Sequence, residues 1–163
     1  MRKTELFSVR SAAKAAVIAA IYVVLTYVFA WCANGAVQVR VAEALTILPM
    51  FTPAAIPGLA IGCMLANLLT GCALWDVAFG TLATLLGAIG TRLLRKYGFV
   101  AILPPVLANI LIIPLVLHFV YGESWPVWLL MLTVGAGELI SCGILGGILL
   151  VTLKKYPVKL FRQ

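Results

Sequence analysis

The amino-acid sequence predicts an all-α integral membrane protein, built as a bundle of six transmembrane helices. Hydrophobic residues make up 64% of its 163 residues, and the mean hydropathy is +1.14. Soluble domains contain only about half apolar residues, so this composition excludes an ordinary soluble domain. Charged residues are scarce, at 10%, and lie mainly between long apolar segments. At this length we expect residues 1–163 to form a single transmembrane domain.

Six apolar segments are expected to cross the membrane, at about residues 12–33, 41–53, 56–71, 75–94, 99–120 and 126–153. The second segment is too short for a full crossing, because its helical rise is only about 20 Å against a hydrocarbon core of about 30 Å. We expect it to be kinked or joined to the preceding loop at membrane depth, where protein or a cavity must cover its backbone. Asn34-Gly35 predicts a turn in that loop, and Gly58 with Gly62 predicts a close-packing face on the third segment.

The basic residues predict the orientation of the bundle. With six spans both ends share a side, and that side holds eleven of the 12 Lys and Arg residues, whereas the other side holds only Arg40. Because cytoplasmic loops are enriched in Lys and Arg, both termini are expected in the cytoplasm. The same placement explains the net charge of +7 by membrane contact rather than by nucleic acid. Trp31, Trp75, Trp125 and Trp128 fall at the outer ends, as an aromatic belt would.

The sequence carries no motif of a catalytic or metal centre. It has no G-x-x-x-x-G-K-[ST] phosphate loop and no H-E-x-x-H, so ATP-driven transport would need a motor in another chain. The four cysteines form no C-x-x-C pair and are expected to be small buried hydrophobes, without a disulfide between Cys32 and Cys72. We therefore expect no enzyme activity, no cofactor and no metal. An intramembrane hydrolase that uses Ser141 beside Glu138 is the weaker alternative.

Arg40 and Glu43 stand three residues apart at the start of the second segment. On a helix they would share a face, so one explanation is an ion pair that only sets the start of that segment. The other explanation is that they form one wall of a polar site, because ionisable groups at membrane depth usually mark function.

Further polar residues gather in the outer half of the bundle. Asn67 and Asp76 flank the outer turn between the third and fourth segments, and Asn109 and Glu138 reach about 16 Å down from the outer ends. A charge at the helix centre costs about 2.5–3.5 kcal/mol, so Glu138 should face the bundle interior with a partner, either a ligand or Asn109. The inner half has almost no such groups away from its rim. This distribution predicts a cavity that opens outward and is closed inward.

The first segment begins AAKAAVIAA, which places Ala12, Ala16 and Ala20 on one stripe, with Ala15 and Ala19 beside it. Small residues four apart let another helix approach closely. Helix propensity and internal packing explain the same residues equally well.

Several blocks recur together in one known family: QVRVAEALTILP (38–49), PGLAIGCMLAN (57–67), WDVAFGTLATLLGA (75–88), the stretch from Leu103-Pro104 to Asn109, and GAGELI (135–140). With six spans, an alanine stripe and an outer cavity, these blocks resemble the queuosine-precursor transporter family, QueT. Its members are substrate-binding (S) components of energy-coupling factor (ECF) transporters. The resemblance covers essentially the whole chain.

This resemblance implies a fold, partners and a ligand class. The fold is a six-helix bundle of the S-component type in a bacterial plasma membrane. The partners are one membrane coupling subunit, which would dock on Ala12, Ala15, Ala16, Ala19 and Ala20, and two cytoplasmic ATPases. The ligand is a 7-deazaguanine such as 7-aminomethyl-7-deazaguanine, or queuine. S components of this type are thought to topple in the membrane and so release substrate inward.

The candidate residues suit such a ligand. A carboxylate accepts hydrogen bonds from ring N–H and amino donors, an Asn or Arg donates to the carbonyl group, and a flat ring stacks on aromatic side chains. A cationic aminomethyl group would pair with a second carboxylate, Asp76 or Glu43. The expected substrate-binding residues are Glu138, Asn109, Asp76, Asn67, Arg40, Glu43, Trp75, Phe79 and Trp31. The same groups would serve another flat, donor-rich vitamin; a stand-alone secondary transporter and an intramembrane enzyme are the alternatives from other classes.

Overall fold

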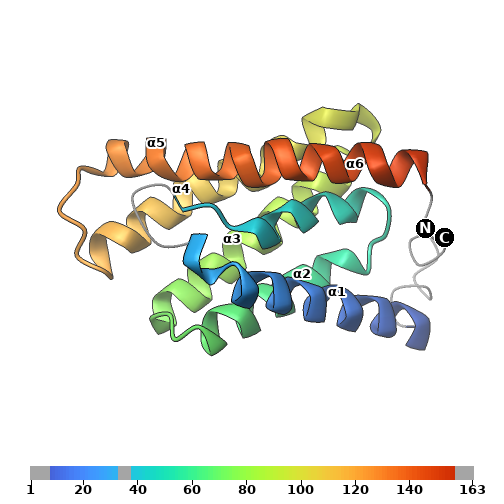
Figure 1. The fold of residues 1–163 in the computed structure, drawn as a ribbon, viewed down its shortest axis with the longest axis horizontal. Coiled ribbons are helices and arrows are strands. Elements are labelled where there is room, and N and C mark those ends of the chain that lie inside the picture. Colours follow the sequence, from blue (N-terminus) through green and yellow to red (C-terminus); the bar gives the residue numbers. More distant parts are fainter. Residues whose placement is uncertain (1–7, 33–37, 157–163) are drawn as a thin grey trace.

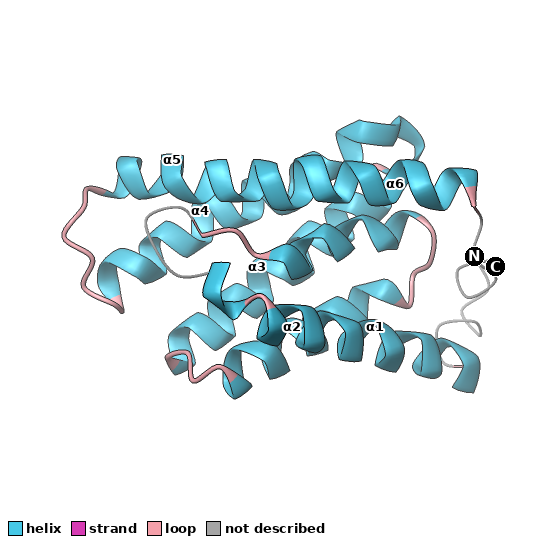
Figure 2. Ribbon diagram, viewed as in Figure 1, coloured by secondary structure: helices cyan, strands magenta, loops and turns pink. Residues whose placement is uncertain are grey.

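The computed structural model describes residues 8–32 and 38–156, and all regular structure in these two ranges is helical (Figure 2). The elements in chain order are α1 (Val9–Val28), η1 (Ala30–Cys32), η2 (Val41–Met50), α2 (Ala55–Leu69), α3 (Leu74–Leu93), η3 (Arg95–Ile102), α4 (Leu103–Phe119), α5 (Val127–Glu138), η4 (Leu139–Leu145) and α6 (Gly146–Lys155). The all-α prediction is therefore confirmed for the described residues. The expected Asn34-Gly35 turn lies outside them.

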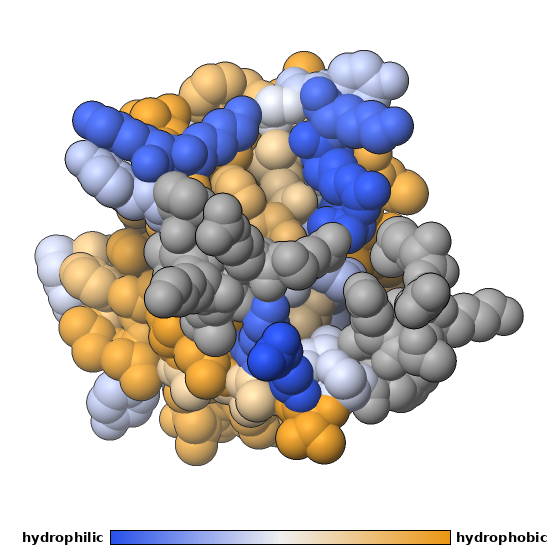
Figure 3. Space-filling model, turned by 90° about the vertical axis from the view of Figure 1, so that its right-hand side faces the viewer, coloured by the Kyte–Doolittle hydropathy of each residue, from blue (hydrophilic) through white to orange (hydrophobic). Residues whose placement is uncertain are grey.

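Each of the six expected spans coincides with a helical stretch. Four stretches are long and apolar enough to cross a membrane, namely Val9–Val28, Leu74–Leu93, Arg95–Phe119 and Val127–Lys155. The other two, η2 and α2, are apolar but shorter. Helix α1 begins and α6 ends at the same end of the bundle (Figure 1), which agrees with an even number of spans. Hydrophilic side chains gather around the rim of this end, with apolar surface beside them (Figure 3).

The second span is a ten-residue 3₁₀-helix, η2, that runs inside the bundle. It packs against α1, α2, α3, η3, η4 and α6, so neighbouring protein covers its backbone, as its short length predicted. Pro49 lies within its last turn. The Nη1 group of Arg92 donates to the carbonyl oxygens of Pro49 and Met50 at 3.0 and 3.2 Å. This arginine supplies the hydrogen bonds that the end of a helix otherwise lacks.

Helices α1 and α2 touch almost backbone to backbone. A Cβ atom added at Gly58 would lie 2.8 Å from the carbonyl oxygen of Ala15, and one added at Gly62 would lie 2.8 Å from Cβ of Tyr22 and 3.1 Å from Cα of Ala19. The predicted close-packing face of α2 is thus confirmed, and its partner is the side of α1 that carries Ala15 and Ala19.

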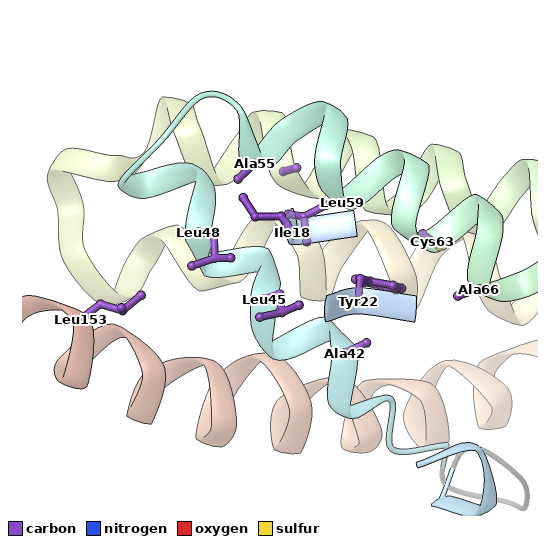
Figure 4. Packing of buried hydrophobic residues seen from close by; sticks show 11 residues of the cluster. Ile18, Tyr22, Ala42, Leu45, Leu48, Ala55, Leu59, Cys63, Ala66 and Leu153 are labelled. Atoms are coloured by element: carbon purple, nitrogen blue, oxygen red, sulfur yellow. The ribbon is translucent and has the colours of Figure 1, made fainter. Parts of the chain in front are cut away.

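The main apolar core lies between α1, η2 and α2 (Figure 4). Ile18, Leu45, Leu48 and Leu59 meet there, and Tyr22 lies at its edge, next to Ala42 and Cys63. A second cluster joins η2 to η3, α4 and the last span through residues such as Ile47, Val106 and Leu150. Because η2 contributes to both clusters, its position in the centre of the bundle is fixed from both sides.

The last span is one long helix with a π-helical segment, η4, in its middle. This segment begins directly after Glu138 and contains Ser141 and Cys142, both buried. Single π turns inside α-helices often occur at functional sites. Here the segment lies beside η2 at mid-bundle.

Candidate functional site: a polar cavity and an inner cluster

A cavity of about 580 Å³ lies at the end of the bundle opposite the hydrophilic rim of Figure 3. Its walls come from the C-terminal halves of α1 and α2, the first turn of α3, the α4–α5 connection and the first half of α5. The polar side chains on its lining are Tyr22, Thr26, Gln38, Arg40, Asn67, Thr70, Asp76, Tyr121, Glu123 and Thr133. Pockets for small ligands commonly have volumes of about 300–1,000 Å³, and this cavity is in that range.

Arg40 is held on the cavity wall by contacts of the two residues that precede it. The amide of Val39 donates to the carbonyl oxygen of Cys32 at 3.1 Å. The carbonyl oxygen of Gln38 approaches α5 so closely at Gly137 that a Cβ atom there would collide with it. The absence of a side chain at Gly137 therefore lets the segment before η2 lie directly on α5 and presents Arg40 to the cavity.

Asp76 is the buried acid of the cavity. It lies in the first turn of α3, where the helix dipole stabilises a negative charge, and it is only 4% exposed. The Tyr121 hydroxyl donates to its Oδ2 at 3.0 Å and accepts from the amide of Ala73 at 3.1 Å. Burial and the negative charge of Asp76 raise the pKa of Tyr121 to about 12, so this hydroxyl is a donor at neutral pH.

The second oxygen of Asp76, Oδ1, has no hydrogen-bond partner within the described part of the chain. The amide nitrogen of Asn67 lies nearby, since both groups are close to Gly80, and it makes only a long 3.8 Å contact with Sγ of Cys63. Arg40 is near enough to Asp76 for direct electrostatic attraction. The cavity thus presents a cation, a buried carboxylate with a free acceptor and an amide that a ligand could engage.

Beneath the cavity lies a second set of polar groups, here called the inner cluster, which comprises Glu43, Thr84, Asn109, Glu138 and Cys142. The carboxylates of Glu43 and Glu138 and the Cys142 sulfur lie within 4.8 Å of one another. Thr84 is next to Glu43, and Asn109 is next to Glu138. The sequence predicted Glu138 and Asn109 at the same depth, and the structure brings them together.

Hydrogen bonds tie the inner cluster to η2 and α1. Glu43 Oε1 accepts a 2.5 Å hydrogen bond from the Tyr22 hydroxyl. Cys142 Sγ donates to Glu138 Oε2 at 3.2 Å and to the Glu43 carbonyl oxygen at 3.5 Å. Two carboxylates and a sulfur could by composition hold a metal ion, which the sequence did not lead us to expect. In this arrangement, however, the sulfur acts as a thiol donor.

The structure separates Arg40 from Glu43. Arg40 precedes η2 and lines the cavity, whereas Glu43 points inward to Tyr22. A helical ion pair, one of the two explanations, is not the arrangement found, because Arg40 is not on the helix, although the two residues remain within electrostatic range of each other.

The nine expected site residues separate into three groups. Arg40, Asn67 and Asp76 line the cavity. Glu43, Asn109 and Glu138 lie in the inner cluster below it. Trp31, Trp75 and Phe79 line neither: Trp31 is 73% exposed, and Trp75 stacks on Phe79 with ring centroids 5.9 Å apart on the outer face of α3. The aromatic wall expected from these three residues is instead formed by Tyr22, Phe29, Tyr121 and Trp125.

Sequence reasoning assigned Trp125 to the aromatic belt and missed seven polar residues of the lining, namely Tyr22, Thr26, Gln38, Thr70, Tyr121, Glu123 and Thr133. Tyr22 had one available signal, since it is a tyrosine in the interior of an apolar span and a buried phenol needs a hydrogen-bond partner. Gln38 and Thr133 carried no comparable signal.

The five alanines of α1 also divide. Ala19 is buried and Ala15 half-buried against α2, whereas Ala12, Ala16 and Ala20 are exposed on the outer side of the helix. Of the four cysteines, Cys63 and Cys142 are buried, as expected, whereas Cys32 and Cys72 are only half-buried.

A helical bundle with apolar outer surfaces and one polar cavity open at one end is a multi-pass membrane protein built to hold a small molecule. The comparison with protein families agrees with this class, since the family model described as QueT transporter matches residues 12–155. The chain belongs to the QueT transporter family, a family of transporters rather than enzymes. The search of curated proteins found no match, and neither did the search of solved structures.

Proposed function

We propose that this chain is the substrate-binding subunit of an ECF-type importer and that it captures a 7-deazaguanine, either a queuosine precursor or queuine, in the cavity. The observation that carries the proposal is that Arg40 and the buried Asp76 line the same cavity of ligand size. Membership of the QueT transporter family supports the ligand class.

The cavity chemistry matches such a ligand group by group. Arg40 and the Asn67 amide are donors for the ring carbonyl, and the free Oδ1 of Asp76 is an acceptor for a cationic aminomethyl group. The rings of Phe29 and Trp125 offer apolar faces for a flat bicyclic ring. Glu138, Glu43 and Asn109 lie directly below and are the groups that the donor edge of the ring would reach next.

Energy for import would come from partner chains. The exposed alanines Ala12, Ala16 and Ala20 on α1 form a surface on which a helix of a coupling subunit can pack closely, and two cytoplasmic ATPases would drive the cycle. Ala15 and Ala19 would support this surface from behind through α2 rather than contact the partner. The hydrophilic rim of Figure 3 would then face the cytoplasm of a bacterial cell.

Calorimetry on the purified chain tests the ligand assignment. We expect tight binding of 7-aminomethyl-7-deazaguanine or queuine, weaker binding of guanine, and no binding of thiamin as a control vitamin. Binding of thiamin in preference to every deazaguanine would show that the proposed ligand class is wrong. Uptake of the ligand into liposomes by this chain alone would show a stand-alone transporter and contradict the subunit role.

A further inference from the structure

Tyr22 is the residue at which the cavity and the inner cluster meet. Its side chain belongs to the cavity lining, yet the residue is only 2% exposed, and its hydroxyl donates to Glu43 Oε1 at 2.5 Å. Figure 4 shows the ring lying beneath α2, between Ala42 and Cys63. Tyr22 therefore contacts the cavity on one side and, through Glu43, the inner cluster on the other.

The inner cluster contains polar atoms that lack partners. Glu43 Oε2, Thr84 Oγ1 and Asn109 Nδ2 make no hydrogen bond within the residues described by the structure, and all three residues are at least nine-tenths buried. Thr84 lies beside Glu43 and Asn109 lies beside Glu138, so part of this hydrogen-bonding capacity is met within the cluster. Glu43 Oε2 remains the acceptor that a ligand would engage, because a buried acceptor without a full hydrogen bond destabilises the fold. Acceptors on Glu43 and a donor on Asn109 match the mixed donor and acceptor edge of a purine-like ring.

We propose that Tyr22 is a gate residue between the cavity and the inner cluster. In the ligand-free state its hydroxyl donates a hydrogen bond to the Glu43 carboxylate. When ligand binds, the phenol turns away, and a ring N–H or amino group of the ligand donates to Glu43 in its place. This inference rests on the proposed function, since it assigns the inner cluster to the same ligand that the cavity admits.

The direction in which one substitution changes ligand affinity distinguishes a gate from a simple contact. In the gate mechanism, ligand must break the Tyr22–Glu43 hydrogen bond, and Tyr22→Phe removes that cost while it keeps the ring. The net contribution of a buried hydrogen bond corresponds to about two- to tenfold in an equilibrium constant, so Tyr22→Phe should tighten ligand binding by up to about tenfold. If Tyr22 only contacted the ligand or supported the fold, the same change would weaken binding or leave it unaltered.

The experiment measures the Kd of 7-aminomethyl-7-deazaguanine for wild type, Tyr22→Phe and the matched control Tyr27→Phe, whose tyrosine is exposed on the same helix. Tighter binding by Tyr22→Phe alone supports the gate, and unchanged or weaker binding overturns it. Wild type that binds no deazaguanine would instead contradict the proposed function.

Cys142 gives a second test that keeps Tyr22 in place. It is 1% exposed and lies in the inner cluster, so a small thiol reagent such as methyl methanethiosulfonate reaches it only when the cluster opens. In a variant with Cys32, Cys63 and Cys72 changed to alanine, saturating ligand should slow modification of Cys142, because ligand fills the opened cluster. Modification at the same rate with and without ligand would show that the ligand does not enter the cluster.

Discussion

The hydroxyl of Tyr121 donates to Oδ2 of Asp76 at 3.0 Å and thereby joins the α4–α5 connection to the first turn of α3. This contact uses one carboxylate oxygen of Asp76 and leaves Oδ1 for a ligand. It also fixes the orientation of a carboxylate whose other oxygen has no hydrogen-bond partner within the described residues.

Asp76→Asn is expected to weaken the binding of cationic ligands much more than the binding of neutral ones. The amide keeps the size of the side chain but removes the charge that would pair with an aminomethyl group. Loss of a charge-assisted hydrogen bond should weaken 7-aminomethyl-7-deazaguanine by about tenfold or more, and should change the affinity for uncharged 7-deazaguanine much less. Calorimetry with both ligands measures the difference. Equal losses for the two ligands would show that Asp76 does not bind the cation.

Glu138→Gln is expected to weaken binding of every deazaguanine. The carboxylate would accept from the donor edge of the ring, and the glutamine amide would turn a donor toward another donor. A buried mismatch of this kind costs about 1–3 kcal/mol, which corresponds to about tenfold or more in Kd. Thermal unfolding serves as the control for folding. Wild-type affinity in a folded Glu138→Gln protein would confine the ligand to the cavity around Arg40 and Asp76.

Ala16→Trp is expected to block assembly with a coupling subunit while ligand binding stays intact, because a bulky ring on the exposed face of α1 holds a partner helix away. Ile21→Trp is the matched control, since Ile21 is exposed on another side of the same helix. Co-purification of the partner measures assembly. Ala19 is unsuitable for this test because it packs against Gly62. If the partner co-purified normally with the Ala16→Trp variant, α1 would not be the docking helix.

Arg92→Gln is expected to destabilise the protein by about 1–3 kcal/mol, because the carbonyl groups of Pro49 and Met50 would lose their donor inside the bundle. Arg95→Gln is the control, since Arg95 is exposed near the same end of α3. The midpoint of thermal unfolding in detergent measures the effect. Equal midpoints for the two variants would show that η2 does not depend on Arg92.

The orientation of the bundle can be checked by cysteine labelling. Single cysteines introduced at residues 36 and 96 should react from opposite sides of the membrane, and residue 96 should react from the cytoplasm. Labelling of both positions from one side would contradict an even number of spans.

The sequence was sufficient to predict the helical spans, because the thickness of a bilayer imposes a length that composition reveals. It was also sufficient for the short second span and for Gly58 and Gly62, since both depend on local features of the chain. Counting residues along a helix located the depth of Asn109 and Glu138 correctly relative to each other.

The sequence could not predict in the same way which face of each helix points into the cavity. Trp75 directly precedes Asp76 and Phe79 follows it by three residues. Since each residue turns a helix by about 100°, their directions differ from that of Asp76 by about 100° and about 60°, and their rings point outward while Asp76 points into the cavity. Glu43 likewise could not be separated from Arg40, because the start of η2 between them decides which way each side chain points. The role of Tyr22 depends on a contact between α1 and η2, which local pattern does not specify.

The close contact of α1 with α2 has a consequence for how such sequences can diverge. At Gly58 and Gly62 an added carbon would collide with the backbone or side chains of α1, so a larger residue at either position requires a compensating shift of α1. Ala12, Ala16 and Ala20 face no such intramolecular restriction. If a coupling subunit docks on these alanines, as proposed, their variation between species should be correlated with that of the partner chain, and covariation between two genes rather than within one would reveal the interface.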